Sequence, residues 1–179
     1  MIIAAGVVFF ILIGILTIFA FPHFSPIPYF PSNKKDIPLI LTALNLRDDQ
    51  IVVDLGAGDG LVVFEAAHRA FQKKLATRFI AVEINPILVF ILHLRKLFHS
   101  NKKNIRIVWA DMFKFKTIEQ YSNMTIFLYI SPWFLEKTLK QIRTLPGKKT
   151  IVSYYYPIKS LRPALTISNG VNPIFVYPL

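Results

Sequence analysis

The sequence predicts an α/β protein in which an open, doubly wound and mostly parallel sheet follows an N-terminal transmembrane helix. Two observations predict the sheet: apolar, β-branched runs alternate with helical stretches after residue 34, and a glycine-rich turn follows the first of these runs. Alternating strands and helices of this length form parallel sheets that helices cover on both faces. A third observation predicts the transmembrane helix, because residues 1–33 contain no Asp, Glu, Lys or Arg.

The first segment is apolar over the length of a membrane span. Between Met1 and Phe21 only Gly6, Gly14 and Thr17 interrupt the apolar side chains. About 20 residues at roughly 1.5 Å each cross a hydrocarbon core of roughly 30 Å. The segment lacks the basic start and the small-residue cleavage site of a signal peptide. We therefore predict a single-pass membrane anchor over residues 1–22, with a buried core helix as the alternative.

A proline-rich link over residues 23–34 follows the anchor. Four prolines in the ten residues 22–31 favour an extended, semi-rigid spacer that keeps the domain close to the bilayer. No basic side chain precedes the span, whereas Lys34, Lys35 and Arg47 follow it. Because positive charge tends to remain on the cytoplasmic side, we expect a membrane localisation with the domain in the cytoplasm.

Residues 35–179 form the predicted domain, in which helices and strands alternate. The strand-like runs are short, apolar and β-branched, and the helical stretches are longer. Proline in the first turn marks the start of the helix at Pro86, and Asn169-Gly170 marks a turn in a C-terminal antiparallel hairpin. The expected elements are helix 35–45, strand 50–55, helix 61–74, strand 78–84, helix 86–98, strand 105–110, helix 116–121, strand 124–130, helix 133–145, strand 150–155, and the hairpin strands 165–168 and 174–177.

A glycine-rich loop joins the first strand to the helix that follows it. Residues 54–60 read Asp-Leu-Gly-Ala-Gly-Asp-Gly. Glycine allows a tight turn at this place and lets a ligand approach the backbone closely. The candidate ligand-binding residues of the loop are Asp54, Gly56, Gly58, Asp59 and Gly60.

Two further acids end the next two strands. Glu83, at the end of the second strand, is placed to accept hydrogen bonds from both hydroxyls of a ribose, and the alternative is a solvated charge at a strand end. Asp111, at the end of the third strand, can accept a hydrogen bond from an adenine amino group, with Met112 against the ring. Asp111 can also cap the helix that follows, and the two roles can coexist.

The charges around the loop favour a cationic ligand. Dinucleotide loops read Gly-x-Gly-x-x-Gly, which leaves a helix N-terminus free for pyrophosphate. Here the spacing is Gly-x-Gly-x-Gly, with Asp54 before the first glycine and Asp59 inside the loop. Two carboxylates repel a pyrophosphate but suit the ammonium and sulfonium groups of S-adenosylmethionine, which also carries adenine and ribose. The expected cofactor is therefore S-adenosylmethionine rather than NAD.

The acidic loop and the two strand-end acids resemble the first three motifs of class I S-adenosylmethionine-dependent methyltransferases, which have a Rossmann-like sheet. Residues 28–32, 54–60, 83–86 and 145–158 together are similar to a small group of membrane-anchored protein-lysine methyltransferases, whose members methylate the ATP synthase c subunit and the adenine nucleotide translocase. The resemblance implies a lysine of a membrane protein as the substrate, and it adds Asn85 to the cofactor-binding residues. It does not imply a mitochondrial location, because the anchor lacks an Arg-rich presequence.

Methyl transfer from a sulfonium depends on positioning and desolvation, so no catalytic residue is assigned. An apolar pocket helps a lysine amine to lose its proton, because burial disfavours the ammonium form. Such a pocket would open where the fourth strand ends, and Tyr29 of the link would close it from the membrane side. For Trp133 and Phe134 the alternative is packing of a helix on the sheet. The substrate-pocket candidates are Ser131, Pro132, Trp133 and Tyr29.

The composition limits the partners and the chemistry. A formal net charge of +11, from 21 Lys and Arg against 10 Asp and Glu, favours anionic partners, and a membrane contacted through the N-terminal helix and a basic surface is one of them. The chain contains no cysteine, which excludes disulfides and thiolate chemistry. Its four histidines are scattered, so no metal site is expected.

Three rival functions stay open. Residues 131–134 also resemble the Asp/Asn-Pro-Pro-Tyr loop of methyltransferases that modify nucleic acid bases. Trp133 in place of the second proline, the lack of length for a target-recognition region, and the membrane anchor argue against this rival. The other two are a methyltransferase of a lipid or small hydrophobic amine, and a non-catalytic scaffold tethered to the membrane.

Overall fold

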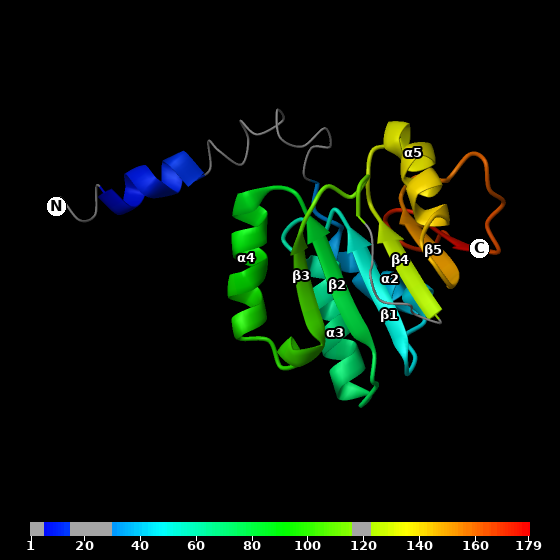
Figure 1. Cartoon of the computed structure of the whole chain (residues 1–179), viewed down its shortest axis with the longest axis horizontal. Helices are drawn as coiled ribbons and strands as arrows, with labels where there is room; N and C mark the ends of the chain where they lie inside the picture. The colour runs from blue at the N-terminus through cyan, green and yellow to red at the C-terminus, as the bar shows by residue number, and fades with distance from the viewer. Residues whose placement is uncertain (1–5, 15–29, 116–122) are drawn as a thin grey trace.

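The computed structural model describes residues 6–14, 30–115 and 123–179, and these residues contain a seven-stranded sheet in the order β3-β2-β1-β4-β5-β7-β6 (Figure 1). Strands β1 to β5 pair in parallel, whereas β7 pairs antiparallel with both β5 and β6. The strands are β1 (Gln50–Leu55), β2 (Arg78–Glu83), β3 (Ile105–Trp109), β4 (Asn123–Leu128), β5 (Lys148–Tyr154), β6 (Leu165–Ile167) and β7 (Ile174–Pro178).

Helices cover both faces of this mixed sheet. One core cluster joins α2, α3 and Leu92 of α4 to one face, and a second cluster joins α5 to the other face. The alternation along β1 supplies both clusters, since Val52 packs toward α2 and α3 while Ile51 and Val53 pack toward α5. The helices are η2 (Lys34–Asp36), α2 (Ile37–Leu44), α3 (Leu61–Gln72), α4 (Pro86–Leu97), η3 (Lys102–Asn104) and α5 (Pro132–Arg143).

The strand order reverses between β1 and β4. The connection after β1 leads to α3 on one face, and the connection after β4 leads to α5 on the other. Two neighbouring strands whose connections diverge in this way leave a crevice at their carboxyl ends, which is where open α/β sheets bind ligands.

The structure confirms the predicted α/β class, the parallel sheet and the C-terminal hairpin. The predicted strands and helices that lie within the described residues begin and end within two residues of the prediction, whereas the short helix η3 was not predicted. The predicted helix 116–121 lies outside the described residues.

The N-terminal segment is described only in part. Residues 6–14 are helical, and the side chains of residues 7–13 are 42–73% exposed. Within the described residues we find no helix of sufficient length and apolar character for a membrane crossing. Most of the predicted anchor (1–22) and link (23–34) lies outside the described residues.

A buried polar network joins the start of the domain to its end. The Tyr154 hydroxyl on β5 donates to the Asp36 carboxylate at 2.7 Å and accepts from the Asn172 side chain at 2.8 Å and from the Asn33 backbone N–H at 3.3 Å. The backbone N–H groups of Val171 and Asn172 also donate to Asp36. This network fixes the segment that enters α2 against the turn between β6 and β7. Tyr154 is 1% exposed and is thus a core residue.

Candidate functional site

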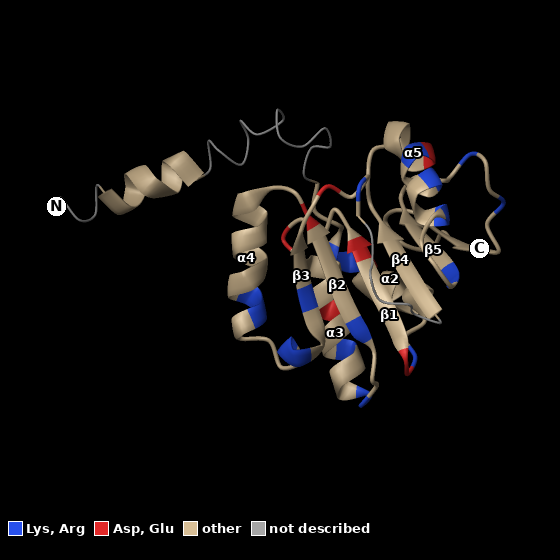
Figure 2. Cartoon of the chain, in the orientation of Figure 1, with Lys and Arg blue, Asp and Glu red and all other residues tan. Residues whose placement is uncertain are grey.

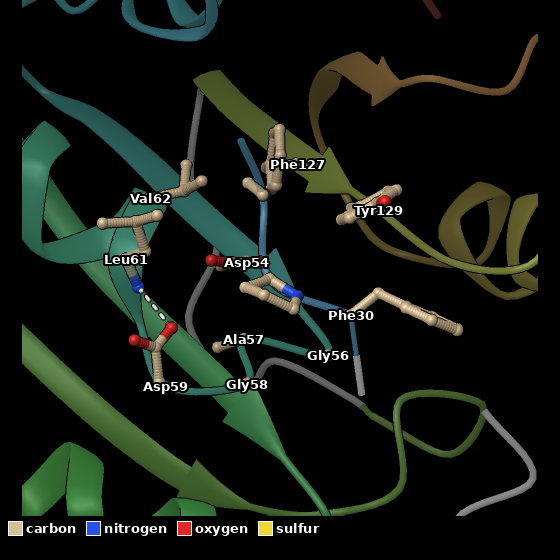
Figure 3. Close-up of a pocket in the computed structure, with 12 residues that line it drawn as sticks. Phe30, Asp54, Gly56, Ala57, Gly58, Asp59, Leu61, Val62, Phe127 and Tyr129 are labelled. Atoms are coloured by element: carbon tan, nitrogen blue, oxygen red, sulfur yellow. Dashed lines mark hydrogen bonds between the residues drawn. The ribbon is translucent and has the colours of Figure 1, made fainter. Parts of the chain in front are cut away.

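A pocket of about 300 Å³, including the open space at its mouth, lies at the carboxyl ends of β1 and β4 (Figure 3). Asp54 and the glycine loop form one side, Phe127 and Tyr129 from the end of β4 form another, and residues 30–32 border it. The lining residues are Phe30, Pro31, Ser32, Asp54, Gly56, Ala57, Gly58, Asp59, Leu61, Val62, Phe127 and Tyr129. The pocket therefore occupies the crevice that the strand order creates.

The glycine loop turns through three left-handed residues. Gly56, Gly58 and Gly60 have φ angles of 83°, 58° and 81°, which side chains with a Cβ rarely adopt. The loop is held to β2, because the N–H groups of Gly56 and Ala57 both donate to the Val82 carbonyl at 2.9 Å. A Cβ on Gly56 would lie 2.7 Å from the Met112 methyl carbon, so a larger residue would displace that side chain.

Gly60 has a structural role in this loop. It stands at the N-terminus of α3, and a Cβ there would lie 2.5 Å from Leu92 on α4 and 2.7 Å from Phe64 on α3. The absence of a side chain at Gly60 thus permits the close packing of α3 and α4. Gly60 is not among the residues that line the pocket, and the packing gives a reason for glycine that the motif alone did not.

Glu83 organises the backbone around the site. One carboxylate oxygen accepts from the N–H groups of Ile84 and Asn85, and the other accepts from Gly58 N–H at 2.8 Å. Burial raises the pKa of Glu83, and these three backbone hydrogen bonds oppose that rise. A carboxylate has about four acceptor positions, so about one remains for a ligand hydroxyl instead of the two that the sequence suggested.

Asp54 is a buried carboxyl group without a hydrogen-bond donor among the described residues. It ends β1 with 4% of its surface exposed and borders the pocket. Burial, with repulsion from Glu83 and Asp59, raises the pKa of Asp54 to about 8. At neutral pH this group therefore holds a proton in the absence of a nearby cation.

Asp59 is paired rather than free. Its carboxylate contacts the Arg95 guanidinium of α4 at 2.8 Å, and its other oxygen accepts from Leu61 N–H at 3.2 Å. Arg95 also donates to the Asp59 carbonyl and lies 4.9 Å from the centre of the Phe64 ring. The protonated Asp54 and the paired Asp59 carry less negative charge than two bare carboxylates, so the repulsion of pyrophosphate is weaker than the sequence suggests.

The remaining cofactor candidates surround the same edge of the sheet. Asn85 caps α4, since its side-chain oxygen accepts from the N–H groups of Ile87 and Leu88. Asp111 accepts from Phe113 N–H at 2.9 Å within a turn, which leaves its second oxygen for other contacts, and the helix that it was expected to cap lies outside the described residues. Figure 2 shows acidic residues in red at this edge of the sheet, although the chain as a whole contains more Lys and Arg than Asp and Glu.

The substrate-side candidates are less closely grouped. Ser131 and Pro132 begin α5, and none of residues 131–133 lines the pocket described above. Trp133 is 86% exposed, so the alternative of packing on the sheet is wrong for this residue. Phe134 does pack, with its ring 5.6 Å from that of Phe113. Tyr29 lies outside the described residues.

Phe30, Phe127 and Tyr129 line the pocket although they were not among the predicted site residues. Burial raises the pKa of the Tyr129 hydroxyl, with smaller contributions from Tyr156 and Tyr155. The position of Tyr129 directly after the fourth strand was a usable signal, because the carboxyl ends of parallel strands share one edge.

Known proteins resemble this chain in sequence and in fold. A family model described as the ANTKMT methyltransferase domain matches residues 54–165. The ATP synthase c-subunit lysine N-methyltransferase of Xenopus laevis is 27% identical over 154 residues, which cover 86% of this chain and 64% of that protein. Protein-lysine N-methyltransferase of Saccharolobus islandicus is 29% identical over 165 residues, covering 87% of this chain and 94% of that protein. The chain thus spans less than two thirds of the length of the Xenopus protein.

Solved structures agree with this picture. An RNA methyltransferase of Salinibacter ruber, in complex with S-adenosyl-L-homocysteine, superposes with a TM-score of 0.69 at 21% sequence identity, covering 83% of this chain and 93% of that one. This likeness confirms the class I methyltransferase type of α/β fold. Together with the family match, it confirms the resemblance drawn from the motifs and S-adenosylmethionine as the cofactor they imply.

Proposed function

The chain belongs to the ANTKMT methyltransferase domain family, and from this premise we propose that it is an S-adenosylmethionine-dependent protein-lysine N-methyltransferase that acts on a membrane protein. Two relatives with protein-lysine methyltransferase names support the acceptor, and one of them is named for the c subunit of ATP synthase. The chemistry of the pocket supports the reaction independently of these names.

The buried carboxyl group of Asp54, which no described residue contacts through a hydrogen bond, is the observation that carries the proposal. A lone acid at this position gains a partner when a cation enters the pocket, and S-adenosylmethionine carries two cationic groups. Glu83 has an acceptor position left for a ribose hydroxyl, and Asp111 has an oxygen left for an adenine amino group. These residues therefore fit the cofactor, which supplies an electrophilic methyl group on its sulfonium.

The aromatic side of the pocket suits the acceptor. Phe127 and Tyr129 form aromatic walls that would strip water from a lysine side chain, and Phe30, which also lines the pocket, is 66% exposed. Loss of water disfavours the ammonium form, so the amine more readily presents a free electron pair. The Tyr129 hydroxyl is protonated at neutral pH, as any tyrosine is whose pKa is at or above its usual value, and its oxygen would orient the amine.

The sequence also supports a membrane-anchored protein, with residues 1–22 in the bilayer, link 23–34 and domain 35–179. The anchor run has the length and composition of a span, and the described residues 7–13 expose only apolar side chains. Eight residues separate the end of this run from Phe30, a reach of roughly 25–30 Å at most. That reach would hold the pocket near the membrane surface. Retention of the full chain in membranes after alkaline carbonate washing, with protease sensitivity of the domain from the cytoplasmic side, would support this arrangement.

To test the reaction, the full chain in detergent is incubated with radiolabelled S-adenosylmethionine and with membranes from the organism that produces the protein. Transfer of label to one protein band, recovered as methyl-lysine after hydrolysis, is the expected result. Asp54→Asn should lose this transfer. Asp49→Asn is the matched control, because Asp49 lies on an exposed turn five residues earlier, with a φ of 53° that asparagine tolerates.

Other destinations of the label would replace the proposal. Label in the lipid extract would indicate a lipid or hydrophobic amine as the acceptor, and label in added nucleic acid would indicate a base methyltransferase. Binding of the cofactor without transfer to any fraction would favour a scaffold. Absence of cofactor binding would refute the assignment of the pocket itself.

A further inference from the structure

One side of α4 exposes a row of large apolar side chains to solvent. Phe90, Leu94, Leu97 and Phe98 follow one another at helical spacing and are 43–89% exposed. Trp109, at the end of β3, is 68% exposed, and its indole N–H donates to the carbonyl of Ile84 just before α4 begins. We call these five residues the α4 surface.

Trp109 points toward the same side of the sheet as α4. Successive side chains of a strand alternate, so Trp109 shares the face of Ile105 and Ile107, which pack in the same core cluster as Leu92 of α4. Strand β3 is the edge strand next to this helix, and both lie at one side of the molecule (Figure 1). The five residues of the α4 surface therefore lie on one face at one edge of the domain.

Cations lie beside the apolar row of α4, whereas the acids Glu83 and Asp111 lie near the Trp109 end of the α4 surface. Between Glu83 and Asp111 the chain has no acidic residue but has Arg95, Lys96, Lys102 and Lys103 on α4 and η3. Arg95 is paired with Asp59, and Lys102 donates to the Leu97 carbonyl, which places its ammonium beside the apolar row. Figure 2 shows basic residues on α4 and on the segment that follows it.

We propose that the α4 surface docks on an anionic bilayer, so that the edge of the sheet formed by α4 and β3 lies against lipid headgroups. This inference rests on the proposed membrane anchoring. Phe and Leu on one side of a helix, with Lys beside them, are the side chains of helices that lie in a membrane interface. Exposed Trp prefers the same headgroup level, and anionic lipids attract the flanking Lys residues.

A second copy of the chain is a less suitable occupant. A symmetric contact through this surface would bring together two surfaces of the same net positive charge, since each carries the cations of the segment between Glu83 and Asp111. The like charges of the two copies would repel each other, whereas the anionic headgroups of a bilayer would attract these cations. The positive charge of the segment between Glu83 and Asp111 thus favours binding to anionic lipid over self-association of the chain.

The two tryptophans of the chain provide the test. Trp109 belongs to the α4 surface, and Trp133 is more accessible (86% against 68%) but lies at the start of α5, which covers the opposite face. Full-length Trp133→Phe and Trp109→Phe variants are reconstituted in vesicles of phosphatidylcholine with or without phosphatidylglycerol, each lipid brominated in turn. Flotation of the protein with the vesicles checks the anchor separately, and binding of S-adenosylmethionine checks the proposed function separately.

Brominated lipid should quench Trp109 at least twofold more strongly than Trp133, and only when phosphatidylglycerol is present. A Leu97→Ser/Phe98→Ser double variant should reduce the quenching of Trp109 to that of Trp133. Leu165→Ser, on an exposed apolar residue of β6 at the other edge of the sheet, should leave it unchanged. Equal quenching of both tryptophans in floated vesicles would overturn the proposal. Protection of Trp109 from both brominated lipid and aqueous acrylamide would also overturn it, because protein would then cover the surface.

Discussion

In the folded protein most Asp54 side chains are protonated at neutral pH, and replacing Asp54 by asparagine removes the ability of this side chain to ionise when a cation binds. The pKa of Asp54 is raised to about 8 by burial and by the nearby Glu83 and Asp59 carboxylates. A cationic ligand in the pocket favours the ionised form of Asp54, so binding and loss of the proton are coupled. Cofactor affinity is therefore expected to depend on pH through this one group.

The size of the effect follows from the fraction of ionised Asp54. With a pKa of about 8, roughly a tenth of the molecules are ionised at pH 7 and roughly a hundredth at pH 6. If only the ionised form binds tightly, the apparent Kd rises by about the inverse of these fractions. The α-amino group of the ligand loses its charge above about pH 8. Affinity for S-adenosylmethionine should thus rise about tenfold from pH 6 to pH 7, rise only about threefold from pH 7 to pH 8, and fall above that.

Titration calorimetry in two buffers of different ionisation enthalpy measures both the affinity and the proton released. The native chain should release close to one proton per cofactor at pH 7. Asp54→Asn should release none, show no rise in affinity between pH 6 and pH 8, and bind about 1.5–3 kcal/mol more weakly at pH 8. Asp49→Asn should match the native chain. A flat profile in the native chain, or the same slope in Asp54→Asn, would refute the reasoning.

The same proton makes a prediction about stability. The pKa of Asp54 is higher in the folded state, about 8, than its ordinary value of 3.8, so the folded state binds the proton more tightly. This contribution is fully present below about pH 4 and is lost as the pH rises toward 8. From this group the free energy of unfolding should fall by about 1.4 kcal/mol per pH unit between pH 5 and pH 7. Urea unfolding should show that slope reduced in Asp54→Asn and retained in Asp49→Asn.

Three further variants test other contacts of the site and the fold. Glu83→Ala should weaken cofactor binding by about 1–3 kcal/mol by calorimetry, since a hydroxyl and three backbone N–H groups lose their acceptor; unchanged affinity would remove Glu83 from the site. Gly60→Ala should lower the free energy of unfolding by about 1–3 kcal/mol, because its φ is 81° and its Cβ would meet the Phe64 ring, and a neutral effect would contradict that packing. Tyr154→Phe should lower it by about 1–3 kcal/mol in urea because Asp36 loses a buried donor, and a fully stable variant would show that the network contributes little.

The elements around the site could be predicted because their patterns are local. Strands β1 and β2 are short apolar runs whose burial is nearly complete, and the proline at the start of α4 marks a helix boundary. The acids Asp54 and Glu83 could be placed together for the same reason, since each ends one of two adjacent parallel strands. Predictions of this kind need only the period of the pattern and the order of the strands.

Partners that meet through packing could not be predicted. The ion pair of Asp59 joins residues 36 positions apart, and it forms because α4 packs beside α3 with Arg95 facing the loop. Nothing in the spacing of charged residues indicates that pair. The backbone N–H groups that bind Glu83 are equally invisible, because every residue has such a group and only the turn geometry directs three of them to one carboxylate.

The exposure of Trp133 shows a different limit. Apolar side chains at the start of a helix usually pack on the sheet, and its neighbour Phe134 does so. Trp133 points to solvent because Pro132 starts the helix and the packed side of α5 is formed by Leu135, Leu139 and Ile142. Which of two adjacent aromatic residues faces inward depends on the rotation of the helix, and a single turn of sequence does not define it.

The hydrogen bonds of Tyr154 also impose an order of events on biosynthesis. Asn33 and Asp36 leave the ribosome early, but their partners at residues 154 and 171–172 are made about 120–140 residues later. At about 5–20 residues per second this interval is on the order of ten to thirty seconds. During that time residues 33–36, which directly follow the pocket-lining residues 30–32, lack these hydrogen-bond partners. The growing chain therefore acquires a complete binding pocket only when its last hairpin has been synthesised.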